Sequence, residues 1–283
     1  MTKIRNIITN LILEAQRYKF SDDVRDRMKS VTEKLWSDRN KPYKGKELVD
    51  VIPFKLADGV EGLARVVVNP RLPYMGQMGT KPQKSVDPAD IVIEVNPKHY
   101  ESKKTLYLTL YHEMIHASDP TQSHLFSPKY MVTYNEKSDK DYWGHPIEFF
   151  AISNEFLEGL VLEFERRVKR NRKIENLQFL EKSLKNIINY FAKGDPLSKL
   201  SKDILFRIND EHLGNDLIRV FKNLTTDNPQ LADFMSERGG EEPYYIYYVE
   251  LIKKYNPEIW KKFLSMLYQT GFEIRDLIQK TEI

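Results

Sequence analysis

The stretch Tyr107–Ala117 reads Y-L-T-L-Y-H-E-M-I-H-A and contains the pattern His-Glu-x-x-His. Apolar residues stand before this pattern and between its two histidines, as they would in a buried helix. On a helix, residues four apart share a face, so His112 and His116 can direct a ring nitrogen toward one point. Two imidazoles suit Zn²⁺, and Glu113 is offset around the helix so that it can reach a water activated by the metal. The pattern predicts a metal-assisted hydrolase.

The same pattern resembles the zincin metallopeptidases, which carry His-Glu-x-x-His on an active-site helix. A catalytic zinc needs a third protein ligand and one open position. In the metzincin branch that ligand is a histidine six residues after the second one. This chain has Gln122 there, and it has Asp119 where the metzincin pattern has a glycine. The chain is more similar to the gluzincin branch, whose third ligand is a glutamate on a later helix.

Two glutamates compete for this third position. Glu136 lies twenty residues after His116, which is the thermolysin-like spacing, but its neighbours are polar and lack helical periodicity. Glu148 follows Pro146, a residue that suits the first turn of a helix, and an apolar face continues from there. Its E-F-F-A context also resembles the third-ligand helices of gluzincins of the anthrax lethal factor type. We favour Glu148, because a helix holds a ligand more rigidly than a loop does.

Three further residues have two or more readings each. His145 could replace Glu148 as a ligand, stabilise an oxyanion, or simply begin the helix. Tyr142 lies near the place where some gluzincins keep a transition-state tyrosine, or it packs as an ordinary aromatic residue. Glu155 could orient one of the histidines or be a polar helix position. The resemblance implies a Zn²⁺ site formed by His112, His116 and Glu148, with Glu113, His145 and Tyr142 as candidate catalytic residues.

The composition is that of an ordinary globular protein. The 283 residues are 41% hydrophobic and 30% charged, with a net charge of +3. The chain has no cysteine, which excludes disulfides and thiolate metal sites. No apolar run reaches the roughly 18 residues of a membrane span, and residues 3–18 have the spacing of an amphipathic helix rather than of a signal peptide. We expect a soluble cytoplasmic protein. Its lysine- and tyrosine-rich composition is similar to that of phage-encoded zincin-like proteins, which leaves virion association open.

The remaining pattern predicts an α+β fold that is mostly helical, with a zincin-like small sheet. A second helix is expected at 21–36, after the Ser21-Asp22-Asp23 capping cluster. Short β-branched runs predict three strands, with Pro53 placing the first at an edge or bulge, and a long loop at 69–85. By resemblance, the strand before the active-site helix would form the edge that pairs with an extended substrate. The strands are predicted at 49–56, 62–68 and 91–95.

Everything after Glu148 reads as helical. We expect an N-terminal segment 1–40, a catalytic domain 41–165 and a helical region 166–283. The basic run Arg166–Lys173 could bind the phosphates of a nucleic acid, although a solvated helix end is the simpler reading. Glycine and proline punctuate helices expected at 147–170, 173–192, 198–209, 212–223, 228–236, 243–254 and 257–280, the last with a break near Gly271.

The sequence therefore predicts a zinc metallopeptidase acting on a peptide or protein substrate, without a membrane partner. Two alternatives come from other classes of protein. One is a zincin-fold structural or virion-type protein that holds zinc without turnover, and the other is a nucleic-acid-binding protein that uses the basic run.

Overall fold

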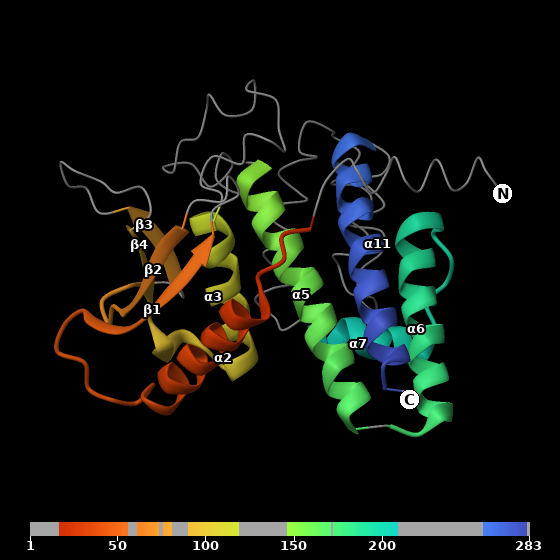
Figure 1. Cartoon of the computed structure of the whole chain (residues 1–283), viewed down its shortest axis with the longest axis horizontal. Coiled ribbons are helices and arrows are strands. Elements are labelled where there is room, and N and C mark those ends of the chain that lie inside the picture. Colours follow the sequence, from red (N-terminus) through yellow and green to blue (C-terminus); the bar gives the residue numbers. More distant parts are fainter. Residues whose placement is uncertain are drawn as a thin grey trace, which may run out of the picture. The chain divides into compact units, whose positions relative to one another are not determined.

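The computed structural model describes residues 17–55, 61–73, 76–80, 90–118, 146–170, 172–208 and 257–281 (Figure 1). The chain divides into two compact units. We call Tyr18–His124 the sheet unit, and Met1–Arg17 together with Leu125–Ile283 the helical unit. The described elements form a mixed α+β protein that is mostly helical and carries a small sheet, as the sequence predicts. The domain boundaries expected at residues 40 and 165 stay predictions.

The sheet has four strands in the order β1-β2-β4-β3. β1 pairs antiparallel with β2, β2 pairs parallel with β4, and β3 pairs antiparallel with β4. Side chains alternate along β2, where even-numbered residues from Gly62 to Val68 are buried and the residues between them are more exposed. In register with them, Ile91, Ile93 and Val95 of β4 are also buried. The strands are β1 (Glu47–Lys55), β2 (Glu61–Val68), β3 (Gly76–Thr80) and β4 (Asp90–Val95).

Two expectations about the sheet are wrong. The predicted loop 69–85 contains β3, which the sequence conceals because Gly76-Gln-Met-Gly-Thr80 has two glycines and no apolar alternation. Its backbone pairs with β4, which provides the hydrogen-bonding edge that a short strand of weak propensity needs. β4 consequently lies between β2 and β3, so it offers no free edge to an extended substrate. The edge position of β1, predicted from Pro53, is confirmed.

Two helices accompany the sheet in this unit: α2 (Asp22–Ser37), which was expected at 21–36, and α3 (Lys103–Ser118). The Ser21 hydroxyl accepts a hydrogen bond from the Val24 amide at 3.4 Å and begins α2. The buried side of α2 packs on β1 and α3, and α3 packs on β2, β3 and β4. The predicted helix 3–18 lies largely outside the described residues, and Arg17 and Tyr18 at its end are not helical.

The helical unit contains four described helices: α5 (Pro146–Arg170), α6 (Ile174–Lys193), α7 (Lys199–Ile208) and α11 (Pro257–Gln279). Each lies close to its predicted position. α11 packs on α5 and α6, and α7 packs on α5 and α6 (Figure 1). The rings of Phe156, Phe191 and Phe263 meet at centroid distances of 5.6 to 6.3 Å and form an aromatic core. The helices predicted at 212–223, 228–236 and 243–254 lie outside the described residues.

The predicted break near Gly271 is wrong, because α11 continues through it. A Cβ at Gly271 would stand 2.5 Å from Cδ1 of Ile188 on α6. The glycine therefore permits close packing of two helices and does not interrupt one. Among the helices of the described ranges, none is long and apolar enough to cross a membrane.

Candidate metal centre

Helix α3 is buried on all sides, which follows from its sequence. From Thr105 to Ser118 every residue except Thr109 is buried. The connection from β4 is also fixed: the Asn96 side chain donates to the Leu72 carbonyl at 2.9 Å, and the Ser102 hydroxyl accepts from the Thr105 amide at 3.1 Å. These bonds hold the loop before β3 and cap the first turn of α3. The helix is therefore a firm support for the side chains it carries.

The two histidines of the motif lie together, as their spacing predicts. The Nε2 atoms of His112 and His116 are 3.0 Å apart, and the rings are nearly perpendicular, with centroids 4.7 Å apart. Both side chains are buried, with 9% and 7% of their surface exposed. Two nitrogens bound to a tetrahedral zinc at about 2.0–2.1 Å would be about 3.3 Å apart. The pair therefore fits two positions of a zinc site. Without a metal, the same spacing suits one ring donating its Nε2–H to the other.

Glu113 is buried beside the pair, with 7% of its surface exposed. It follows His112 directly, so on the helix it lies about 100° around the axis from that histidine. At this offset the carboxylate would not bind a metal held by the two histidines, but it could reach a water molecule bound to that metal. The structure thus brings together the three motif residues on one rigid element.

The other predicted site residues are placed only in part. Glu148 lies in the first turn of α5, begun by Pro146 as expected, in the helical unit. Its side chain is outside the described atoms, and Glu136, Tyr142 and His145 are outside the described residues. Glu155 is buried on α5, and its predicted role in orienting a histidine stays a prediction. Within the ranges that the structure describes, no group of three or more His, Cys, Asp or Glu side chains could hold a metal ion.

The basic run is partly neutralised by its own helix. Glu163 accepts hydrogen bonds from Nε of Arg166 at 2.9 Å and from Nε of Arg167 at 2.8 Å. Burial tends to raise the pKa of the Glu163 carboxyl, but the two guanidinium groups outweigh it and lower the pKa below its ordinary value. Two of the cations proposed for nucleic-acid binding are therefore engaged in holding a buried carboxylate.

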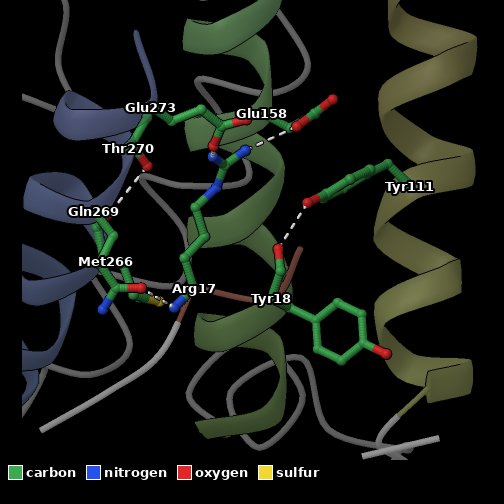
Figure 2. A network of polar contacts seen from close by, with 8 residues as sticks. All are labelled: Arg17, Tyr18, Tyr111, Glu158, Met266, Gln269, Thr270 and Glu273. Atoms are coloured by element: carbon green, nitrogen blue, oxygen red, sulfur yellow. Dashed lines mark hydrogen bonds and ion pairs between the residues drawn. The ribbon is translucent and has the colours of Figure 1, made fainter. Parts of the chain in front are cut away.

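Sequence reasoning missed a set of polar contacts at the start of the described chain (Figure 2). The Tyr111 hydroxyl of α3 donates to the Tyr18 carbonyl at 3.0 Å. In the helical unit, the Arg17 guanidinium donates to Glu158 of α5 at 2.8 Å and to Glu273 of α11. The sequence indicated only that Tyr111, immediately before the first motif histidine, lies in an apolar segment and is buried. A lone arginine at the end of an expected amphipathic helix gave none.

Comparisons with protein-family models, with curated proteins and with solved structures find no match for this chain.

Proposed function

We propose that the chain is a zinc-dependent metallopeptidase with a gluzincin-like site. The observation that carries the proposal is the 3.0 Å approach of the two Nε2 atoms on a buried helix. Water around an exposed pair would compete for these nitrogens, whereas a buried pair with converging nitrogens is already organised for a cation. The residue types agree, because neutral imidazoles are borderline ligands that suit zinc.

Three residues would hold the metal: His112 and His116 from α3, and Glu148 from α5, the last chosen from the sequence alone. The metal would supply a Lewis acid that polarises a peptide carbonyl and lowers the pKa of water from 15.7 to about 7. Glu113 would accept a proton from the attacking water and deliver it to the leaving amine. His145 and Tyr142 are the proposed donors to the oxyanion.

The substrate would bind as an extended strand, and the topology of the sheet changes the strand with which it would pair. β4 is paired on both sides, so the expected docking strand is unsuitable. β3 is the neighbouring edge strand, and α3 packs on it as well as on β4. The described strands have two edges, β1 and β3, and we choose β3 because it contacts α3, the helix that carries the histidines. We propose that a peptide adds to the sheet there through main-chain hydrogen bonds.

Metal content tests the ligand set directly. We expect about one zinc per chain in the purified wild-type protein by elemental analysis. His116→Asn and Glu148→Ala should lose most of it, whereas Glu113→Gln and Glu136→Ala should retain it. Loss with Glu136→Ala in place of Glu148→Ala would make the site thermolysin-like. A wild-type chain that takes up no zinc, even when zinc is supplied, would end the proposal.

Turnover separates the peptidase from a zinc protein without activity. A pool of fluorogenic peptides should be cleaved by the zinc-loaded chain, and a chelator should stop the cleavage. Glu113→Gln is the matched control, because it should keep the metal and lose activity by at least about 100-fold. Retained zinc with no cleavage of any peptide would favour the structural alternative.

A further inference from the structure

Tyr111 holds a position that the proposed chemistry does not use. It precedes His112 on α3, and its side chain is fully buried. Its hydroxyl donates to the Tyr18 carbonyl at 3.0 Å, and its ring meets the Phe20 ring edge-on at a centroid distance of 5.2 Å. Figure 2 shows the hydroxyl pointing away from α3 toward that carbonyl. The residue beside the first motif histidine is therefore fixed at both its ring and its hydroxyl.

The acceptor of this hydrogen bond is itself held in place. The Tyr18 hydroxyl donates to the carbonyl of Lys55, the last residue of β1, at 3.0 Å. The Tyr18 ring also meets the Phe20 ring at a centroid distance of 4.8 Å. These contacts all lie within the sheet unit, and they limit the positions open to Tyr18 and its carbonyl.

We propose that Tyr111 is a positioning residue for the metal-binding histidines. The inference rests on the proposed metal site. A side-chain atom about 6 Å from a helix axis moves by about 1 Å when the helix turns by about 10°. A metal site needs its ligands within about 0.5 Å of the productive geometry. The Tyr111 hydrogen bond resists such a turn at the position next to His112.

A purely stabilising role would look different from a positioning role. If Tyr111 only stabilised the fold, its loss would lower the unfolding temperature and leave the folded chain's metal affinity unchanged. If it positions the histidines, the folded chain should bind metal more weakly, and the coordination geometry should change. Cobalt(II) reports both quantities, because its visible absorption depends on the geometry of its ligands.

The test is a titration of the full metal-free chain with cobalt(II) and, by competition with a chromophoric chelator, with zinc. Tyr111→Phe removes the hydroxyl alone and should raise the zinc dissociation constant by about 10-fold, with a changed cobalt spectrum. Tyr107→Phe is the matched control. It removes a buried tyrosine hydroxyl one turn earlier on α3, leaves the bond to Tyr18 intact, and should change neither quantity.

Wild-type affinity and spectrum in Tyr111→Phe would overturn the positioning role while leaving the metal site standing. A wild-type chain that binds neither metal would remove the proposed function and this inference together.

Discussion

Helices α3 and α5 are both buried and both carry buried polar side chains, but these side chains have different partners. On α5, Glu158 is paired with Arg17, and Glu163 is paired with Arg166 and Arg167. On α3, two imidazoles point their Nε2 atoms at each other. These two buried acids of α5 thus meet cations from the chain itself, whereas the nitrogens of α3 converge on one point.

The contrast distinguishes polar groups that stabilise the fold from polar groups that can bind a ligand or take part in catalysis. A buried carboxylate matched to arginines is satisfied, and removing one partner should cost stability without affecting chemistry. Two acceptors held face to face gain nothing from each other unless a proton or a cation stands between them. Burial and charge alone would rank the two helices as equal candidates for an active site. The direction of the polar atoms distinguishes them.

The largest expected effect comes from breaking the ion pair between Arg17 and Glu158 of α5, which we call the α5 pair. Arg17→Met leaves Glu158 and Glu273 without the guanidinium that joins them, and we expect a loss of about 3–5 kcal/mol in the free energy of unfolding, measured with urea. The control is Lys29→Met, which removes an exposed pair with Asp26 and should change stability by less than about 0.5 kcal/mol. Equal effects in the two variants would contradict the structural role of the α5 pair.

The second-largest expected effect concerns the histidine pair of α3. Zinc at 100 times its dissociation constant should stabilise the wild-type chain by about 2.7 kcal/mol, because only the folded state offers the site. His116→Asn should abolish this gain in thermal or urea unfolding. His99→Asn, which alters an exposed histidine of the same unit near the Leu72 carbonyl, should keep it. Stabilisation of all three proteins by zinc would mean that the metal binds elsewhere.

The sequence predicts these two regions unequally, for physical reasons. The histidine pair is local: a spacing of four residues on a helix determines it, so it is found where expected. Likewise, the spacing of apolar residues, with glycine and proline between the segments, predicts the described helices. β3 and the Arg17 contacts depend on partners distant in the chain. Gly76–Thr80 becomes a strand because β4 offers an edge, and Arg17 is 141 residues from Glu158. No local pattern contains that information.

A third effect concerns how α11 meets α6, where the sequence suggested a break. Gly271→Ala should gain up to about 1 kcal/mol of helix propensity but lose more through the contact with Ile188 Cδ1, for a net loss of about 1 kcal/mol. In an Ile188→Val background that methyl group is absent. The same substitution should then stabilise the chain by about 0.5 kcal/mol relative to Ile188→Val alone. The reversal of sign, measured by urea unfolding, tests close packing. A loss in both backgrounds would show that the contact with Ile188 Cδ1 is not the reason for the glycine.

The smallest effect is a dependence on pH that belongs to α5. The pKa of Glu163 is lowered in the folded chain, because Arg166 and Arg167 outweigh the burial that would raise it. The folded state therefore holds the ionised form more firmly than the unfolded state does. This contribution is present above the ordinary carboxyl pKa of 4.5 and is lost as the pH falls through the lower folded value. Glu163→Gln should be less stable than the wild type at pH 7, and the difference should shrink between pH 5 and pH 3. A difference that stays constant over that range would show that the two arginines stabilise α5 through packing and not through the charge of Glu163.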